Sequence, residues 1–271
     1  MSTLDLIFDT SGHAGLGGEG RVPRVVLVGA GPGDPGLLTR KAYDALQAAD
    51  VAFFDELVSP EIMELLPART RCIYVGKPCK SGAISQGDII QQLITAARRG
   101  LKVVRLKAGD PMIFGRAGEE IEGLRAAGVA VDVIPGITSA SGAASSTGIS
   151  LTHRDYAAQV SFVTAARREG ELADVKGLAG AGRTLVVYMG IARASALSDA
   201  LREDGVDGAL PIAIVENATR PEERVIITTV GGLADALAHN AVRSPALFIV
   251  GDVVRTYQGA HVSAAQTLAP L

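Results

Sequence analysis

From Arg24 onward, short β-branched segments alternate with helix-forming segments, and this alternation narrows the choice of fold more than any other feature. In the first half of the chain we expect strands over 25–28, 51–54, 72–75, 103–106 and 131–134, and helices over 37–48, 60–66, 88–99 and 119–127. Alternation of this kind predicts a mostly parallel sheet with helices on both faces.

The segment Pro135–Ser139, which reads PGITS, interrupts the alternation and is a candidate linker. After it we expect helices over 140–147, 192–204 and 233–238, and strands over 160–163, 184–188, 212–216, 225–229 and 246–250. This second half predicts another α/β layer with more antiparallel pairing. The expected organisation is a flexible leader over 1–21, an N-terminal α/β domain over 22–136, a C-terminal α/β domain over 137–256 and a flexible tail over 257–271.

Composition excludes several classes of function. With 48% apolar and 20% charged residues, 271 residues can bury a sizeable core, and no run of about 18 apolar residues predicts a membrane span. The net charge of −3 and the 4% aromatic content do not favour nucleic-acid binding. Cys72 and Cys79 have no further ligands at metal-binding spacing, and residues 1–20 lack a secretory pattern. We expect a soluble cytoplasmic protein with reduced thiols and no metal.

The stretch Lys107–Arg116, which reads KAGDPMIFGR, stands where a predicted strand ends and a predicted helix begins. Ligands of open α/β sheets bind at the carboxyl ends of the strands. Gly109 permits a close approach of backbone to a ligand, and Asp110 can accept hydrogen bonds. Taken alone, the stretch is explained equally well by a tight turn with an aspartate cap.

The loop Gly31–Gly36, which reads GPGDPG, matches the G-x-G-x-x-G pattern of dinucleotide-binding folds, and Asp50 or Asp55 could be assigned to the ribose. A pyrophosphate site requires free backbone N–H groups. Pro32 and Pro35 have none, and both fix φ near −65°. The loop therefore favours a neutral or cationic ligand, with a structural turn as the simpler alternative.

Nine segments, in order and at similar spacing, resemble the uroporphyrinogen-III C-methyltransferases of the tetrapyrrole methylase family. They are Val28–Thr39, Phe54–Val58, Tyr74–Lys77, Lys107–Arg116, Val133–Ser139, Gly148–Arg154, Val187–Gly190, Val215–Thr219 and Ser244–Ala246. The resemblance covers roughly residues 24–256. Any single segment is weak evidence for the family, but nine segments in this order are specific to it.

The resemblance implies a homodimer in which S-adenosylmethionine lies between two α/β domains. It implies two successive C-methylations of uroporphyrinogen III to precorrin-2, for sirohaem- or cobalamin-type biosynthesis, with S-adenosylhomocysteine as the second product. The residues that it assigns to the cofactor are Pro32, Ala108, Gly109, Asp110, Ile113, Thr138, Ser139, Met189 and Ala218.

The resemblance also assigns catalytic and substrate-binding residues. Asp55 is the implied proton acceptor and Lys77 the implied proton donor, and the simpler alternative is an ion pair between them. Arg116 and Arg154 are candidates for binding the carboxylates of the substrate. Arg116 and Glu119 are also candidate catalytic residues, with Glu119 either holding Arg116 or joining the proton transfer. A local helix pair between the two is the alternative. We expect His153 to be structural.

Some positions depart from the family pattern. Ala108 stands where a glycine is usual, Phe54 where a tyrosine is usual, and Val163–Ala166 reads VTAA in place of VTGH.

Three other functions remain as alternatives: a methyltransferase for a later precorrin, a dinucleotide oxidoreductase and a non-catalytic binder of S-adenosylmethionine. The implied product, precorrin-2, serves the pathways to sirohaem, cobalamin and haem d1 alike.

Overall fold

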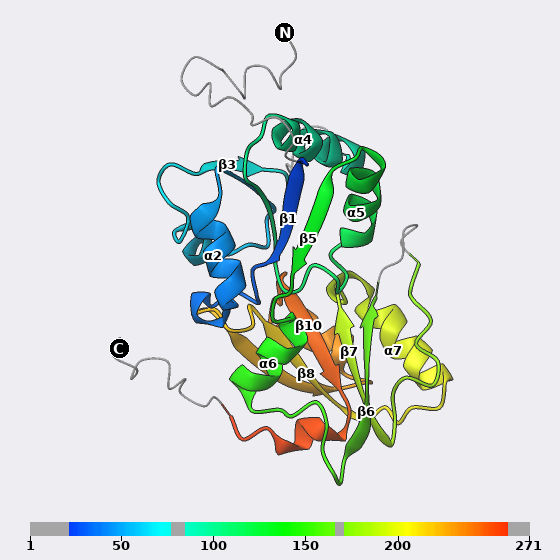
Figure 1. Cartoon of the computed structure of the whole chain (residues 1–271). Helices are drawn as coiled ribbons and strands as arrows, with labels where there is room; N and C mark the ends of the chain where they lie inside the picture. The colour runs from blue at the N-terminus through cyan, green and yellow to red at the C-terminus, as the bar shows by residue number, and fades with distance from the viewer. Residues whose placement is uncertain (1–21, 77–84, 166–170, 260–271) are drawn as a thin grey trace. The chain divides into compact units, whose positions relative to one another are not determined.

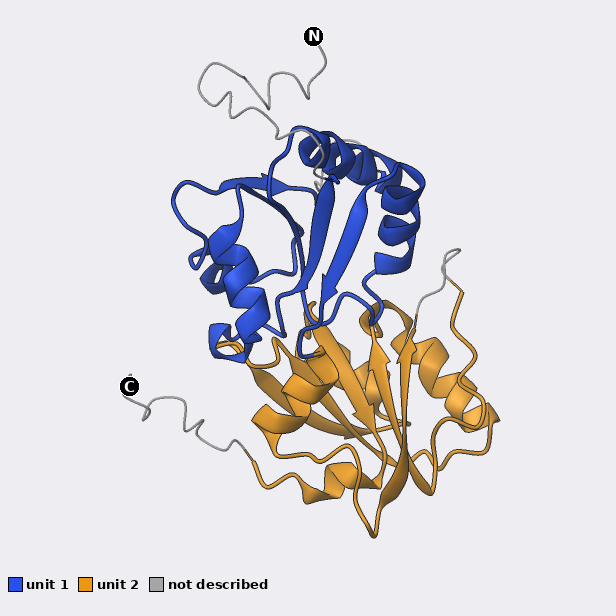
Figure 2. Ribbon diagram, viewed as in Figure 1, with its two compact units in different colours: residues 1–137 blue, residues 138–271 orange. Residues whose placement is uncertain are grey.

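The structure is a computed structural model that describes residues 22–76, 85–165 and 171–259 (Figure 1). The chain divides into two compact units, residues 1–137 and 138–271 (Figure 2). The predicted leader over 1–21, most of the predicted tail, and Lys77, Cys79 and Ala166 lie outside the described residues.

The N-terminal unit contains a five-stranded sheet in which every neighbouring pair is parallel, as the sequence predicted. Its strands, in spatial order, are β3 (Arg71–Tyr74), β2 (Val51–Phe54), β4 (Val103–Lys107), β1 (Arg24–Gly29) and β5 (Ala130–Ile134). Its helices are α2 (Arg40–Ala48), α3 (Pro60–Met63), α4 (Gln86–Arg98) and α5 (Ala117–Ala126).

Two apolar clusters cover the two faces of this sheet. Ala42 and Leu46 of α2 pack with Leu106 of β4 on one face, whereas Leu93 of α4 and Leu124 of α5 belong to the cluster on the other face. β1 and β4 are neighbours, yet the chain leaves β1 towards β2 and leaves β4 towards β5. The carboxyl ends of β1 and β4 therefore form the topological switch point, where open α/β sheets bind ligands.

All four helices of this unit differ from the predicted bounds, α4 and α5 by one or two residues at each end and α2 and α3 by three residues at one end. α2 begins at Arg40, because Leu38 and Thr39 are extended and the Thr39 side chain accepts a hydrogen bond from the Ala42 N–H. A separate 3-10 turn occupies Pro35–Leu37. α3 ends at Met63, three residues before the predicted end.

The C-terminal unit contains a second five-stranded sheet, and three of its four strand pairs are antiparallel. Its strands, in spatial order, are β6 (Ala157–Thr164), β7 (Gly182–Tyr188), β10 (Ala246–Val250), β8 (Pro211–Glu216) and β9 (Arg224–Thr229). Its helices are α6 (Ser139–Thr147), α7 (Ala194–Glu203) and α8 (Leu233–His239), with 3-10 turns at Ile191–Arg193 and Asp252–Thr256.

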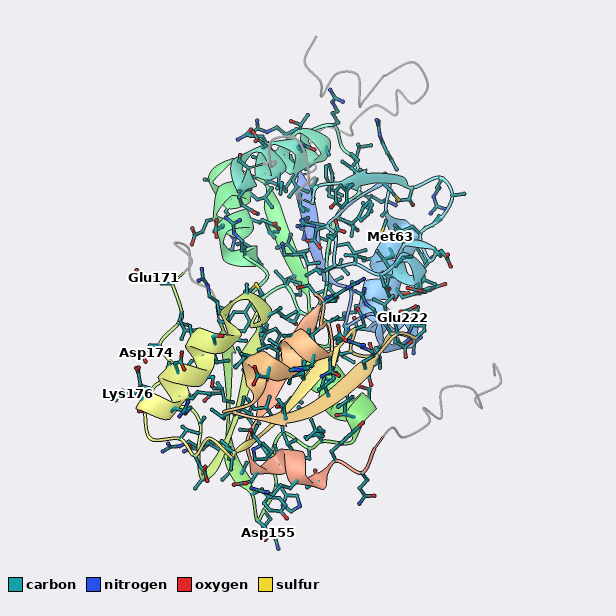
Figure 3. The ribbon with its side chains drawn as sticks, turned by 180° about the vertical axis from the view of Figure 1, so that it is seen from behind. Met63, Asp155, Glu171, Asp174, Lys176 and Glu222 are labelled. Atoms are coloured by element: carbon teal, nitrogen blue, oxygen red, sulfur yellow. The ribbon has the colours of Figure 1, made fainter. Side chains whose placement is uncertain are left out.

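One face of this sheet packs against α7 and α8, and the other packs against α6 and the turn at Asp252–Thr256. That turn was not predicted, and the predicted helix over 192–204 divides into a 3-10 turn and α7. Charged side chains such as Glu171, Asp174 and Lys176 lie on the connection between β6 and β7 and are exposed (Figure 3).

Candidate functional site

The loops that follow β1 and β4 are joined to each other at the switch point. Gly31 N–H donates to Gly109 O over 3.2 Å, and Gly109 N–H donates to Gly31 O over 2.7 Å. Both residues have a positive φ, +72° for Gly31 and +67° for Gly109, which a side chain would strain. The structure thus brings together the two glycine motifs that the sequence singled out.

The start of the segment after β5 packs against the same loops. A Cβ atom on Gly136 would lie 2.2 Å from Gly109 O, and one on Gly29 would lie 2.4 Å from Gly136 N. The Asp110 carboxylate accepts Gly136 N–H on Oδ2, over 3.0 Å, and Met112 N–H on Oδ1, over 2.8 Å. Asp110 therefore ties the β4 and β5 loops together, a role that the sequence did not reveal.

The loop after β1 offers no phosphate cradle. The Gly36 N–H already donates to the Asp34 carboxylate over 2.8 Å, and Pro32 and Pro35 supply no N–H group. The buried Ser59 hydroxyl donates to Gly33 O and holds the loop in place. With these N–H groups missing or already paired, the loop favours a neutral or cationic organic group over a phosphate.

Two departures from the family pattern fit the structure without strain. Ala108 is not among the residues with a positive φ, so its methyl group imposes no backbone strain. The Phe54 ring packs edge-on against the Tyr74 ring, with centroids 5.6 Å apart.

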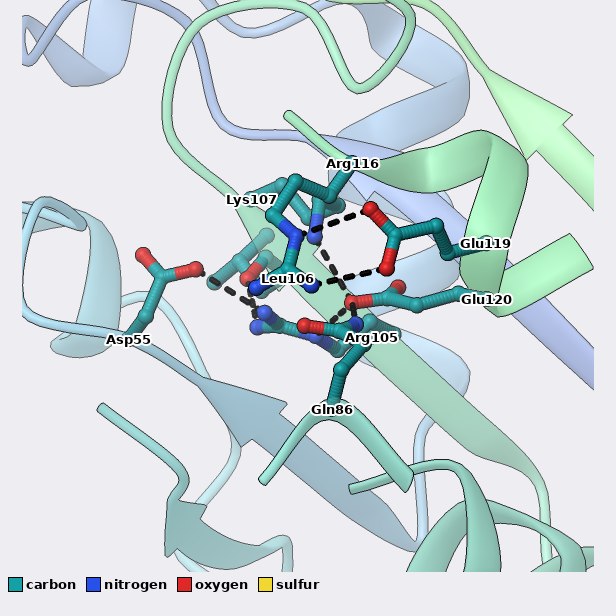
Figure 4. Close-up of polar contacts among 8 residues, drawn as sticks. All are labelled: Asp55, Gln86, Arg105, Leu106, Lys107, Arg116, Glu119 and Glu120. Atoms are coloured by element: carbon teal, nitrogen blue, oxygen red, sulfur yellow. Dashed lines mark hydrogen bonds and ion pairs between the residues drawn. The ribbon is translucent and has the colours of Figure 1, made fainter. Parts of the chain in front are cut away.

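A buried charged cluster lies beneath the loop after β4, centred on Glu120 of α5, whose exposed fraction is 0% (Figure 4). Its Oε1 atom accepts hydrogen bonds from Lys107 Nζ and Gln86 Nε2, both over 2.8 Å, and from Arg105 Nε over 3.4 Å. Its Oε2 atom is buried without a hydrogen-bond partner in the described part of the chain. One glutamate thus accepts hydrogen bonds from side chains of both β4 and α4.

Arg105 connects this cluster to Asp55 (Figure 4). Its Nη2 atom donates to Asp55 Oδ2 over 2.9 Å, and its Nη1 atom donates to Leu106 O over 2.9 Å. The Asp55 side chain is 27% exposed, whereas that of Arg105 is 4% exposed. Arg105 is a partner of Asp55 that the sequence did not indicate, and the alternative pairing with Lys77 falls outside the described residues.

Burial lowers the pKa of Lys107 from its usual range, and the neighbouring charge of Arg105 adds to that effect. The negative charge of Glu120 and its hydrogen bond act in the opposite direction. The sequence contained one signal for this cluster. Arg105 and Lys107 stand two residues apart, hence on one face, in a strand that is otherwise apolar.

Arg116 and Glu119 form a separate, exposed pair at the start of α5. Arg116 donates from Nε and Nη2 to the two carboxylate oxygens of Glu119, over 3.0 and 2.7 Å, and this hydrogen bonding raises the pKa of Arg116. The side chains are 55% and 38% exposed. This is the geometry of the local helix pair, and it leaves the guanidinium accessible to an anionic ligand.

Arg154 lies exposed in the C-terminal unit, in the turn before β6. Its neighbour His153 accepts the Asp155 N–H on Nδ1 over 3.1 Å and stacks obliquely against Tyr156. His153 thus has the local structural contacts that we expected of it.

The C-terminal residues assigned to the cofactor gather at one edge of the second sheet. Tyr188, at the end of β7, is paired with Leu247, and Glu216, at the end of β8, is paired with Ala246. Met189 and Ala218 therefore follow strands that end at the same level, on either side of the start of β10. Thr138 joins them, because its Oγ1 atom lies 2.6 Å from the Tyr188 hydroxyl oxygen.

Neither a metal centre nor a membrane span was found in the described ranges. No group of three or more His, Cys, Asp or Glu side chains is arranged to hold a metal ion there. Within the same residues, no helix is long and apolar enough to cross a bilayer.

Comparison with known proteins identifies similar chains. The family described as tetrapyrrole (corrin/porphyrin) methylases matches residues 24–234. Siroheme synthase of Chromobacterium violaceum is 47% identical over 239 residues, covering 88% of this chain and 51% of the relative. Siroheme synthase of Edwardsiella ictaluri is 50% identical over 230 residues, covering 85% and 50%. The chain spans about half the length of the curated relatives it matches.

Solved structures are similar over most of the chain. The uroporphyrin-III C-methyltransferase of Thermus thermophilus, complexed with S-adenyl homocysteine, superposes with a TM-score of 0.76 at 42% identity. The match covers 86% of this chain and 100% of that one. A cobalt precorrin-4 methyltransferase superposes with a TM-score of 0.75 at 26% identity, covering 85% of this chain and 95% of that one.

Proposed function

The chain belongs to the tetrapyrrole methylase family, and we propose that it transfers methyl groups from S-adenosylmethionine to uroporphyrinogen III, giving precorrin-2. The observation that carries this proposal is the match, at 42% identity, to the whole of a uroporphyrin-III C-methyltransferase solved with S-adenyl homocysteine. The proposal concerns methylation alone, because the chain matches about half of each siroheme synthase. Precorrin-2 would then serve sirohaem- or cobalamin-type biosynthesis.

The loops at the end of each sheet where the assigned cofactor residues lie support the binding of S-adenosylmethionine. In the N-terminal unit the joined glycine loops, with their prolines and the Asp34–Gly36 contact, favour a cationic organic group over a phosphate. S-adenosylmethionine supplies a methyl group on a positively charged sulfonium sulfur. The residues that we propose to bind it are Pro32, Ala108, Gly109, Asp110 and Ile113 from the N-terminal unit and Thr138, Ser139, Met189 and Ala218 from the C-terminal unit.

We propose that Asp55 accepts the proton that the tetrapyrrole loses in each round of methylation. Each round forms one carbon–carbon bond and breaks one sulfur–carbon bond, so one proton must leave the tetrapyrrole. Arg105 fixes Asp55 through Oδ2, and in the described part of the chain Oδ1 has no hydrogen-bond partner. Oδ1 is therefore the atom that would take the proton. Lys77 stays our proposed proton donor.

We propose that Arg116 and Arg154 bind carboxylates of the substrate. Both are exposed, and a guanidinium binds a carboxylate through two parallel hydrogen bonds. Glu119 holds the Arg116 fork in one orientation, so that a substrate carboxylate meets a pre-oriented partner. Glu119 would share or yield this contact when substrate binds.

We further propose that the protein acts as a homodimer in the cytoplasm. Both proposals rest on its membership of the family. The oligomeric state can be checked by light scattering.

A later precorrin is the alternative substrate, favoured by the similarity to a cobalt precorrin-4 methyltransferase. That similarity is weaker in sequence, 26% against 42% identity. The test is to incubate the purified protein with anaerobically generated uroporphyrinogen III and methyl-labelled S-adenosylmethionine. The mass of the tetrapyrrole is then determined by mass spectrometry. A gain of two methyl groups is expected. No gain, despite binding of S-adenosylhomocysteine, would contradict the proposal and favour a later precorrin or a non-catalytic binder.

A further inference from the structure

The hydroxyl group of Tyr188 lies at the first turn of α6. It accepts a hydrogen bond from the Ala140 N–H over 3.2 Å, and it lies 2.6 Å from Thr138 Oγ1. The first N–H groups of a helix have no acceptor within the helix. The Thr138 side chain, at the N-cap position, makes no capping hydrogen bond of its own. Tyr188, from a strand distant in sequence, therefore supplies the cap.

α6 depends on such a cap because its sequence supports a helix poorly. Ser139–Thr147 reads SASGAASST, rich in serine and with a glycine in its interior, and it has no acidic residue in its first turn. An isolated helix of nine residues is marginal in water. The contact with Tyr188 thus adds a fixed point for Thr138 at the start of this helix, beside the packing of Ala140 and Ala143 in the core.

The Tyr188 side chain is itself held firmly. Its ring packs edge-on against Phe162, with centroids 6.1 Å apart, and its backbone oxygen accepts the Ala165 N–H over 2.8 Å. Burial raises the pKa of the hydroxyl, so that it stays protonated and can donate to Thr138. A fixed ring aims this hydroxyl at α6.

Directly after Tyr188 the chain turns sharply. Met189 has a φ of +54°, and 55% of the residue is exposed. The next residue, Gly190, lies against Phe248, because a Cβ atom there would be 2.4 Å from a ring carbon. The turn at Met189 is therefore fixed on one side by Phe248 and on the other by Tyr188.

We propose that Tyr188 is a positioning residue for S-adenosylmethionine, which fixes Thr138 and Ser139 relative to Met189 before the ligand arrives. The inference rests on the proposed function. A site that is ordered in advance pays less conformational entropy on binding. Loss of the hydroxyl should consequently weaken binding of the cofactor and leave the chemical step almost unchanged.

The test is the variant Tyr188→Phe, which keeps the ring and removes one oxygen atom. Because the hydroxyl makes the contacts with Ala140 N–H and Thr138 Oγ1, its loss predicts that the Kd for S-adenosylhomocysteine, measured by calorimetry, rises about three- to tenfold. The KM for S-adenosylmethionine should rise by a similar factor, with kcat within about twofold of the wild type. In the ligand-free protein, the Ala140 amide should exchange its hydrogen faster.

The matched control is Thr147→Val, at the other end of the same helix. Thr147 is buried, and its hydroxyl donates to Ala143 O over 2.6 Å. This variant should lower the melting temperature and leave the Kd unchanged. An unchanged Kd in Tyr188→Phe, or equal increases in both variants, would overturn the positioning role. Failure of the wild type to bind S-adenosylhomocysteine would instead overturn the proposed function and the inference with it.

Discussion

Gly31 and Gly109 exchange two backbone hydrogen bonds, of 3.2 and 2.7 Å, across the carboxyl ends of the neighbouring strands β1 and β4. Two loops separated by more than seventy residues in sequence thereby form one rigid edge. Gly136 packs directly against Gly109 and adds the loop after β5 to that edge. The candidate site of the N-terminal unit is thus built on backbone contacts that side chains would prevent.

Gly136→Ala should disrupt this edge. The added methyl group would stand 2.2 Å from Gly109 O, so the loop must shift, and we expect a loss of about 1–3 kcal/mol in the free energy of unfolding and weaker binding of S-adenosylhomocysteine. Gly118→Ala is the control, because its added Cβ would meet no atom within 4 Å outside its chain neighbours and the backbone of its own helix, and alanine favours the helix. Urea denaturation that ranks both variants alike would contradict this account.

The consecutive residues Glu119 and Glu120 should respond differently to substitution. Glu120→Gln leaves the buried Lys107 without its counter-charge and leaves Arg105 with Asp55 alone, and we expect it to cost about 3–5 kcal/mol of stability. Glu119→Gln breaks an exposed pair, and we expect a cost of about 0–1 kcal/mol. Chemical denaturation of the two variants measures the difference. Equal losses would show that the buried cluster contributes no more to stability than the exposed pair.

Lys107 should make stability depend on pH in the alkaline range. Burial holds its pKa in the folded protein below the ordinary value of 10.5, so the unfolded chain binds the proton more tightly. The free energy of unfolding should therefore rise, through this group, as pH increases towards 10.5. Relative to Lys107→Met, the wild type should gain stability as the pH rises towards 10.5. A flat or falling difference between the two proteins would contradict the lowered pKa.

Asp55→Asn should remove the proposed proton acceptor with little change in shape. We expect methyl transfer to fall by about a hundred- to ten-thousandfold, while the Kd for S-adenosylhomocysteine stays the same. Asp132→Asn, which removes an exposed carboxylate paired with Arg24, is the control and should keep full activity. Unchanged methyl transfer by Asp55→Asn would exclude Asp55 as the base.

The strand positions could be predicted from sequence because they depend on local patterns. The apolar runs at Val51–Phe54 and Ala246–Val250 are strands with the predicted bounds. Helix starts were predicted less well, since the start of α2 depends on a single capping contact of Thr39.

The buried cluster could not be predicted, because its members come from separate elements. Gln86 and Glu120 stand on different helices, and only the folded sheet brings them to Lys107. The same holds for Tyr188, whose hydroxyl meets a helix fifty residues earlier in the chain. Sequence motifs identified the loops, whereas the contacts that fix those loops depend on tertiary structure.

The most direct test of the candidate site is a crystal structure of the protein grown with S-adenosylhomocysteine. We predict that the ligand contacts the loop at Gly109 and the turn at Met189, with both hydrogen bonds between Gly31 and Gly109 preserved. A ligand bound away from Gly109 and Met189 would contradict the account.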